Sequence, residues 1–260
     1  MTTLGLETAP AVRLRPYQVQ AIEAVEAAFA RGVRRPLVVM PTGSGKTVVF
    51  SHLVSRRPGR SLILAHRDEL IAQSAAKLQM VSGSLDIGIV EARSDEHGAR
   101  VVVASVQTLA RPGRAERLGG FETVIVDEAH HAVAATFRDV LERLGCFTDP
   151  QVLTAGFTAT AGRSDNVGLG AVWEEIAYQR GIVQMIAEGY LGNVKAIQVG
   201  ADFDLGNVKV SGGDYTDASI GAELERSHAL DAAAEAYRRH AADRPGVAVH
   251  ANDRDRPRAR

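Results

Sequence analysis

The chain has 260 residues, 45% of them hydrophobic, which is enough for one large domain or for a domain with part of another. Its 30 Lys and Arg residues nearly balance 31 Asp and Glu residues, and the net charge of −1 excludes a protein that holds duplex nucleic acid mainly by overall charge. The single cysteine excludes an intrachain disulfide and a metal site built from a cysteine cluster, so we expect Cys146 to be a structural thiol.

Membrane and secretory signals are absent from the sequence. No stretch reaches the roughly 18 consecutive apolar residues of a membrane span. The first residues lack the basic and then apolar pattern of a signal peptide. We therefore expect a cytoplasmic protein with no membrane partner.

Residues 13–30 predict the first helix. Pro16 lies at a favourable first helical position, and apolar side chains recur along one face of the segment. Gln18 and Gln20 are polar residues near its start, and in an isolated helix both would be solvated.

The segment 40–47 reads MPTGSGKT and follows an apolar run at 36–39 that predicts a short strand. A strand that breaks into Gly-Ser-Gly and restarts as a helix directs several backbone N–H groups into one concavity, where the helix N-terminus adds partial positive charge. This pattern predicts a polyphosphate site, in which Lys46 would contact the β- and γ-phosphates and the Thr47 hydroxyl would hold Mg²⁺. The predicted nucleotide-binding residues of this loop are Thr42, Gly43, Ser44, Gly45, Lys46 and Thr47.

Further strands alternate with helices along the first two thirds of the chain. Continuous apolar runs predict strands at 61–65, 86–90, 100–105, 123–127 and 151–157, with helical patterns in several of the intervals. Strands that are apolar throughout and alternate with helices indicate an α/β domain, with a parallel sheet covered by helices on both faces.

The pattern loosens after residue 166. We expect a strand at 172–178, a helix at 182–188 and a strand at 194–199, leading away from the first core. A single helix is predicted over 223–241, with a Glu235–Arg239 pair one turn apart. A strand at 246–251 would start a second sheet.

An acidic pair lies at the carboxyl end of the predicted strand 123–127, where ligands lie in open parallel sheets. Asp127 would hold Mg²⁺ opposite Thr47, and Glu128 would orient or deprotonate the attacking water. His130 is expected to hydrogen-bond between the γ-phosphate site and the next strand end, and His131 to lie at the surface. Neighbouring helical residues do not face each other, which disfavours a zinc pair. Two solvated carboxylates capping a helix remain the alternative for this tetrapeptide taken alone.

The order of the motifs RPYQ, MPTGSGKT, LAHRDELIAQ, ASVQTLA, DEAH and TAT resembles that of superfamily 2 helicases and translocases of the DEAD/DEAH type. The similarity is greatest to the branch of restriction-enzyme motor subunits and DNA-repair helicases, and residues 13–165 carry it. Met40 stands where the strict phosphate-loop pattern has glycine, a variant seen in helicases. Ala161 replaces a proline that the family often has, whereas Arg163 and Asp165 match.

The resemblance implies a RecA-like fold, with ATP and Mg²⁺ as cofactors and nucleic acid as partner. DNA is preferred to RNA only through the resembling branch. Gln18 would read adenine, and Thr158 with Thr160 would couple the ATP site to strand movement. Arg67, Gln107 and Thr108 match segments that follow the nucleic-acid backbone, with helix capping or a surface role as the alternative. The implied catalytic residues are Lys46, Asp127, Glu128 and His130.

The resemblance also divides the chain. We expect residues 1–165 to form the N-terminal RecA-like ATP-binding domain, 166–244 to connect, and 245–260 to be the truncated start of a second RecA-like domain. In the family that second domain supplies arginine fingers, which are worth about 10³ to 10⁵ in rate. Nucleotide binding with feeble hydrolysis and no unwinding is therefore expected. A truncated gene product, a shifted reading frame and a specialised short protein all remain open for the polar ending.

Two other classes of function are weighed against a motor domain. A non-catalytic module that binds ATP or nucleic acid and regulates a longer relative would bind nucleotide without turnover. A P-loop kinase or GTPase is disfavoured, because the DEAH and TAT strand ends have no role there and no guanine-reading N-K-x-D motif occurs.

Overall fold

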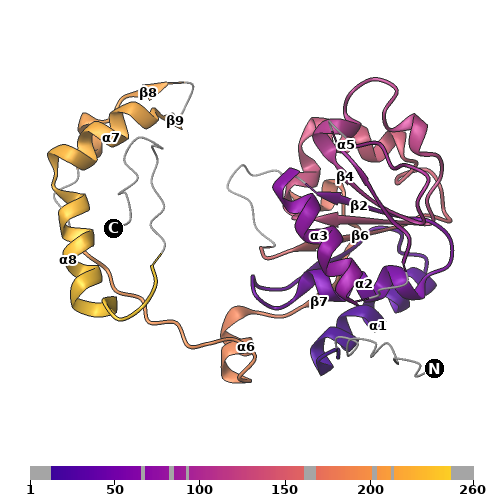
Figure 1. Ribbon diagram of the computed structural model, residues 1–260, viewed down its shortest axis with the longest axis horizontal. Helices are drawn as coiled ribbons and strands as arrows, with labels where there is room; N and C mark the ends of the chain where they lie inside the picture. Colours follow the sequence, from indigo (N-terminus) through magenta and orange to yellow (C-terminus); the bar gives the residue numbers. More distant parts are fainter. Residues whose placement is uncertain are drawn as a thin grey trace, which may run out of the picture. The chain divides into compact units, whose positions relative to one another are not determined.

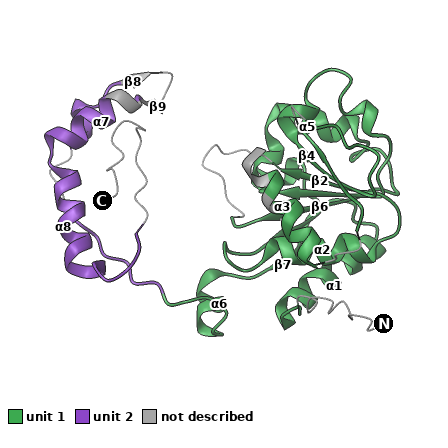
Figure 2. Cartoon of the chain, in the orientation of Figure 1, with its two compact units in different colours: residues 1–193 green, residues 194–260 purple. Residues whose placement is uncertain are grey.

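The computed structural model describes residues 13–65, 68–81, 85–91, 94–160, 168–200, 204–211 and 214–246 (Figure 1). They belong to two compact units, Met1–Asn193 and Val194–Arg260 (Figure 2). Arg67, Ala161, Arg163 and Asp165 lie outside the described residues. No helix in the described ranges is long and apolar enough to cross a bilayer.

The first unit is built on a 7-stranded sheet in which every pairing is parallel. The strand order is β3-β4-β2-β5-β6-β1-β7, so β6 lies between β5 and β1 and the carboxyl ends of these three strands are neighbours. The strands are β1 (Pro36–Val39), β2 (Ser61–Ala65), β3 (Ile87–Val90), β4 (Val101–Ser105), β5 (Thr123–Asp127), β6 (Leu153–Thr158) and β7 (Glu175–Gln179).

Helices cover both faces of the sheet, as the apolar strands require (Figure 1). Alternate residues of β1 point to opposite cores, with Leu37 and Val39 in one and Val38 in the other. One face carries α1 (Pro16–Ala30), α2 (Lys46–Arg56), α3 (Asp68–Val81) and α6 (Ile182–Ala187). The other carries α4 (Val106–Leu109), η1 (Glu116–Leu118), η2 (Ala129–Val133), α5 (Ala135–Arg143) and η3 (Leu169–Ala171).

The α/β fold with a parallel sheet is confirmed, as are the strands β1 to β6 close to their predicted limits. The expected structural thiol is confirmed as well. Cys146 is buried in the core, and burial raises its pKa to about 11, which keeps it protonated and unreactive near neutral pH.

The predicted course of the chain after residue 166 is wrong at two points. The strand expected at 172–178 becomes β7 and joins the first sheet beside β1, because β1 would otherwise leave its backbone groups unpaired at an edge. The strand expected at 194–199 does not form, and Val194 and Ile197 there are 72% and 44% exposed. An apolar run without a neighbouring strand gains too little burial to become ordered as one.

The first compact unit ends later than the domain boundary expected at residue 165. β7 and α6 both belong to it, and the unit closes at Asn193. The boundary at 165 itself falls among undescribed residues, and so does most of 245–260. The division into an ATP-binding domain, a connector and a second domain therefore stays a prediction.

The second unit holds a short antiparallel hairpin and two helices. Its elements are η4 (Leu205–Asn207), β8 (Val210–Ser211), β9 (Asp214–Tyr215), α7 (Asp217–Arg226) and α8 (Ala229–Ala241). The single helix expected over 223–241 is thus two helices, because the backbone turns at His228 with φ 50. The Glu235 carboxylate pairs with Arg238 at 3.2 Å, and the pair expected with Arg239 is replaced by this one.

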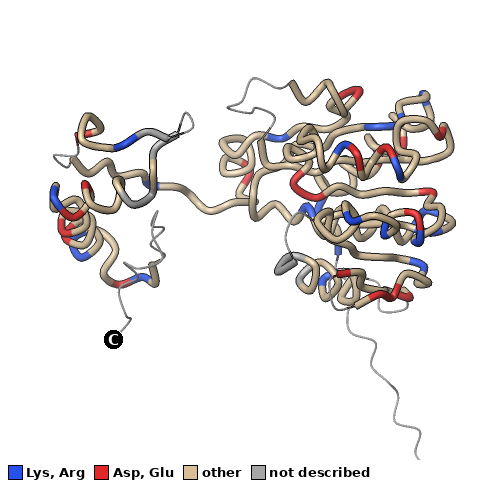
Figure 3. Tube along the Cα trace, turned by 90° about the horizontal axis from the view of Figure 1, so that it is seen from above, with Lys and Arg blue, Asp and Glu red and all other residues tan. Residues whose placement is uncertain are grey.

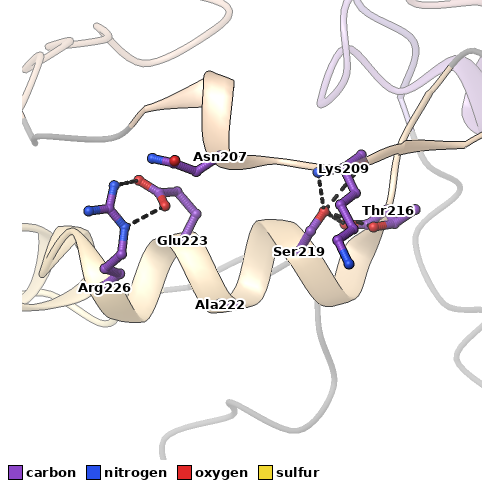
Figure 4. Close-up of a pocket in the computed structure, with 7 residues that line it drawn as sticks. All are labelled: Asn207, Lys209, Thr216, Ser219, Ala222, Glu223 and Arg226. Atoms are coloured by element: carbon purple, nitrogen blue, oxygen red, sulfur yellow. Dashed lines mark hydrogen bonds and ion pairs between the residues drawn. The ribbon is translucent and has the colours of Figure 1, made fainter.

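Glu223 joins η4 to α7 in the second unit. Its carboxylate accepts hydrogen bonds from Asp204 N at 3.0 Å and from Arg226 Nε and Nη2 at 2.8 and 2.7 Å. Figure 4 shows this pair at one end of a pocket of about 460 Å³, with Lys209 and Ser219 towards the other. The Arg226 guanidinium and the Asp204 amide lower the pKa of Glu223 to about 2. The charges of Glu223 and Arg226 therefore neutralise each other.

Acid should loosen the second unit. The folded pKa of Glu223 is below the value of about 4.3 expected in an unfolded chain. Its contribution to stability is therefore complete above about pH 5 and is lost as the pH falls towards 2. The protection factors of the α7 amides, which correct the exchange rates for their intrinsic pH dependence, should fall over this range, and much less so in Glu223→Gln. Glu225 is a neighbouring exposed residue, and Glu225→Gln should show the same pH dependence of protection as the parent. The same pH dependence in Glu223→Gln and Glu225→Gln would contradict the role given to Glu223.

Candidate nucleotide-binding site

The loop between β1 and α2 has the backbone of a phosphate cradle. Gly43 and Gly45 have φ of 82° and 80°, a left-handed conformation that glycine adopts without strain. Ser44 between them is buried, and its N–H and hydroxyl both donate to Pro41 O, at 3.2 and 2.6 Å. The tight turn leads directly into Lys46, so the loop lies at the positive, N-terminal end of α2.

The two side chains expected to hold phosphate and metal begin α2. Lys46 is half-buried, and its Nζ donates to Met40 O at 3.4 Å, so that the side chain crosses its own loop. Thr47 is half-buried beside it, whereas Thr42 is exposed. The predicted loop residues thus lie in one tight turn and in the first residues of α2.

Two side chains at the start of α1 donate hydrogen bonds to the middle of the phosphate loop. Gln18 is 5% exposed, its Oε1 accepts from Arg15 N at 2.9 Å, and its Nε2 donates to Ser44 O at 3.1 Å. Packing therefore buries a side chain that would be solvated in an isolated helix. The Tyr17 hydroxyl donates to the same Ser44 oxygen at 2.7 Å. Sequence reasoning missed Tyr17, although it stands next to Gln18 in the RPYQ motif. The adenine-reading role of Gln18 stays a prediction.

Gly45 should tolerate no side chain without loss of binding. A Cβ there would lie 2.6 Å from Gln18 Nε2, so the amide would have to leave Ser44. Gly45→Ala should therefore weaken Mg-ATP binding, and left-handed strain should lower the free energy of unfolding by about 1–2 kcal/mol. Gly113 also has a positive φ, of 74°, and open space around it. Gly113→Ala should show comparable destabilisation in thermal melts with unchanged affinity; equal loss of affinity in both would contradict the contact argument.

The acidic pair ends β5 at the same edge of the sheet. Glu128 has φ 51 and ψ 51, a left-handed conformation that costs a non-glycine residue about 1–2 kcal/mol and occurs preferentially at functional sites. Its N–H donates to Asp127 Oδ1 at 3.0 Å. Burial raises the pKa of Asp127, the Glu128 charge adds to this rise, and the Lys46 charge opposes it. Lys46 and Asp127, far apart in the sequence, thus influence each other electrostatically.

His130 connects the acidic pair to β6. Its Nδ1 lies 3.0 Å from Thr158 Oγ1 and 3.4 Å from Glu128 Oε2. The Thr158 hydroxyl in turn donates to Thr160 O at 3.1 Å and accepts from Thr160 N at 3.3 Å. On the other side of β6, Met40 N donates to Thr158 O at 2.9 Å. Thr158 therefore contacts both the acidic motif and the base of the phosphate loop.

The donor set suits magnesium better than zinc. A threonine hydroxyl at the start of α2 and a carboxylate at the end of β5 are hard oxygen ligands, and Mg²⁺ takes a few of these together with phosphate oxygens. His131 is half-buried, not at the surface as expected, and its ring lies 4.1 Å from that of His130. Within the described ranges, no three His, Cys, Asp or Glu side chains are grouped to hold a metal ion.

The residues expected to follow nucleic acid are only partly brought together. Gln107 is exposed at the start of α4, at the carboxyl end of β4. Thr108 is 3% exposed, its N–H donates to Ser105 Oγ at 3.1 Å, and its hydroxyl accepts from the same atom. Ser105 caps α4 through these bonds and Thr108 is buried in the first turn of that helix, so Gln107 is the accessible member of the two. Figure 3 shows basic and acidic residues interspersed along the trace of the first unit.

Phosphate loop, acidic pair and TAT segment follow three adjacent parallel strands, which defines a RecA-like P-loop motor domain of the superfamily 2 helicase type. Residues 11–163 match the family described as "Type III restriction enzyme, res subunit". The chain belongs to this family, and its matched residues form an N-terminal domain of the superfamily 2 helicase type.

Two relatives agree with this assignment. The "Putative ATP-dependent helicase IRC3" of Saccharomyces cerevisiae is 34% identical over 237 residues, which are 86% of this chain and 34% of that protein. The DNA 3'-5' translocase XPB2 of Sulfurisphaera tokodaii is 31% identical over 155 residues, covering 59% of this chain and 32% of that protein. The chain thus spans about a third of the length of these relatives.

A solved structure shares the fold. The nuclease-deletion mutant of the Type ISP restriction-modification enzyme LlaGI, in complex with a DNA substrate mimic, matches with a TM-score of 0.53 at 20% identity. The match covers 68% of this chain and 21% of that chain. At this identity the likeness concerns the fold alone.

Proposed function

We propose that this chain is an ATP-binding motor domain that acts on DNA and hydrolyses ATP slowly by itself. The observation that carries the proposal is the contact of His130 with both Glu128 and Thr158, which joins the acidic pair to the strand beside the phosphate loop. A kinase or GTPase has no use for such a connection. The names of XPB2 and of the LlaGI complex support DNA as the nucleic acid.

Each residue of the site then has a role in phosphoryl transfer. The loop N–H groups and Lys46 bind the β- and γ-phosphates, and Gln18 holds the loop from the adenine side. Bound Mg²⁺, held by Thr47 and Asp127, would neutralise charge on the phosphates. Glu128 takes a proton from the attacking water. His130 hydrogen-bonds with Thr158, so a change at the γ-phosphate reaches the TAT segment.

The matched residues 11–163 hold the phosphate loop and the acidic pair. In P-loop NTPases an arginine finger supplied from outside such a set of residues is worth about 10³ to 10⁵ in rate. We therefore expect firm nucleotide binding and a low basal rate from these residues assayed by themselves.

Two measurements test the proposal. Calorimetry should detect binding of Mg-ATP and Mg-ADP, and duplex DNA should accelerate phosphate release more than RNA of the same length does. Absence of nucleotide binding would contradict the motor assignment. Binding with no turnover, even with DNA present, would instead favour the non-catalytic regulatory module.

A further inference from the structure

A short turn after α6 lies against the phosphate loop. The turn passes through Gly189, with φ 75, and both Tyr190 N and Leu191 N donate to Met185 O, at 2.9 and 3.1 Å. The Met185 side chain is fully buried in the core that α1 and α2 share with the sheet. The backbone of this turn is therefore fixed to the same core that supports the loop.

The aromatic half of the turn contacts the residue that closes the loop. The rings of Tyr190 and Tyr17 pack edge to face, with centroids 4.6 Å apart and planes inclined by 65°. The Tyr17 hydroxyl donates to Ser44 O, and Arg15 Nη1 donates to Tyr190 O at 3.4 Å. Tyr190 is thus one side chain removed from the middle of the phosphate loop.

The aliphatic half of the turn lies beside the loop. Leu191 Cδ2 lies 3.5 Å from the position that a Cβ on Gly43 would take, so it borders the open side of this glycine. Gly43 has a positive φ and little intrinsic preference for one conformation, so a neighbour on this side limits its freedom. The turn therefore lies next to Gly43 through Leu191 and reaches Ser44 through Tyr190 and Tyr17.

Arg180 braces the turn from the strand side. Its N–H donates to Val39 O at 2.9 Å, at the end of β1 from which the loop departs. Its guanidinium lies 5.6 and 5.9 Å from the ring centroids of Tyr17 and Tyr190, and it forms an ion pair with Glu188. Arg180 thus contacts the strand before the loop, both tyrosine rings and Glu188 just before the turn.

We propose that Tyr190 and Leu191 are positioning residues for nucleotide binding, which hold the phosphate loop in its binding conformation through Tyr17 and Gly43. The inference rests on the proposed function, because it concerns the same nucleotide site. Coupling between two sites is reciprocal. Nucleotide in the loop therefore tightens the turn, just ahead of Asn193, where the first unit ends.

Substitutions in the full chain test the turn. Tyr190→Ala and Leu191→Ala should each raise the Kd of Mg-ADP by about three- to tenfold, the range set by an aromatic or aliphatic contact. Tyr190→Phe keeps the ring and should restore binding to within about twofold of the parent. Val183→Ala, on the exposed face of α6 at 77% exposure, should leave the Kd unchanged.

A double-substitution cycle separates positioning from general destabilisation. Tyr17→Phe removes the hydroxyl that contacts Ser44, so the effect of Tyr190→Ala should shrink in that background if it acts through Tyr17. Additive effects in the two backgrounds would overturn the proposed route through Tyr17.

Hydrogen exchange tests the reciprocal effect without any substitution. Saturating Mg-ADP should slow exchange of the amides at 189–191 by several-fold, while the α5 amides at 137–141 keep their rates. A chain that binds Mg-ADP yet shows no slowing at 189–191, and no change of Kd in the variants, overturns the inference and leaves the proposed function standing. A parent chain that binds no nucleotide contradicts the proposed function itself.

Discussion

Replacing Lys46 by alanine should raise the Kd of Mg-ATP by about ten- to a hundredfold, because a charge-assisted contact with phosphate is worth about 1.5–3 kcal/mol. The side chain crosses the loop it belongs to, with Nζ 3.4 Å from Met40 O, and is thus held against the start of the phosphate loop. Its charge also opposes the rise of the Asp127 pKa. Alanine removes both effects while keeping the helical start of α2. Calorimetric titration with Mg-ATP and Mg-ADP measures the change.

A second lysine supplies the control for charge alone. Lys195 is exposed, and Lys195→Ala removes the same unit of charge from the chain. Its Kd should equal that of the parent, and both variants should melt close to the parent temperature. Parental affinity in Lys46→Ala would mean that the loop does not bind the triphosphate, and the motor assignment would fall with it.

The positions of most strands were predictable from the sequence, because strands of a buried parallel sheet have continuous apolar runs bounded by polar turns. The run at 61–65 became β2 with the expected limits. The runs at 172–178 and 194–199 show where this signal ends. Both are partly apolar, but one finds a partner in β1 and the other finds none among the described residues. Strand formation there depends on an edge made by distant residues, which local pattern does not encode.

The site was predictable where a motif carries its own chemistry. The glycines around Ser44 and the acidic pair at the end of β5 are local patterns with local reasons. The contact between Tyr17 and Tyr190 has no such signal, because the two rings come from segments far apart in the chain and are joined only by packing. Thr108 shows the opposite case, because this residue, carried over from the resemblance, is buried in the first turn of α4 and bonded to the helix cap Ser105.

β6 connects the two halves of the candidate site. It separates the strand of the phosphate loop from the strand of the acidic pair, and Thr158 at its end contacts both, through Met40 N and His130 Nδ1. A parallel sheet in chain order would have placed β2 beside β1 instead. β2 lies instead on the far side of β5, so that β5 and β6, the strand that ends in the TAT segment, lie between β2 and β1.

Replacing Glu128 by glutamine should lower the rate of phosphate release by at least about a hundredfold, since a general base typically contributes about 10² to 10⁴ in rate. Glutamine has the same size, so the left-handed backbone and the N–H contact to Asp127 are kept. The Kd of Mg-ATP should stay within about threefold of the parent, because Glu128 acts on water and not on the phosphates. Single-turnover assays with DNA present measure the rate even if the basal value is low.

Glu142→Gln is the matched control, because Glu142 is an exposed carboxylate on α5 paired with Arg138 at 3.1 Å. It should keep the parental rate and affinity. The combination of lost turnover with kept binding in Glu128→Gln alone would identify the base. If Glu128→Gln also lost binding, the strained turn would be supporting the whole site and not the water; if it kept the rate, another group would have to activate the water. His130 Nδ1 lies 3.4 Å from Glu128 Oε2, so His130→Ala in the same assay separates the two explanations. If Glu128→Gln acts by disturbing the turn, His130→Ala should cause a similar loss of rate. If Glu128→Gln acts by removing the base, His130→Ala should not.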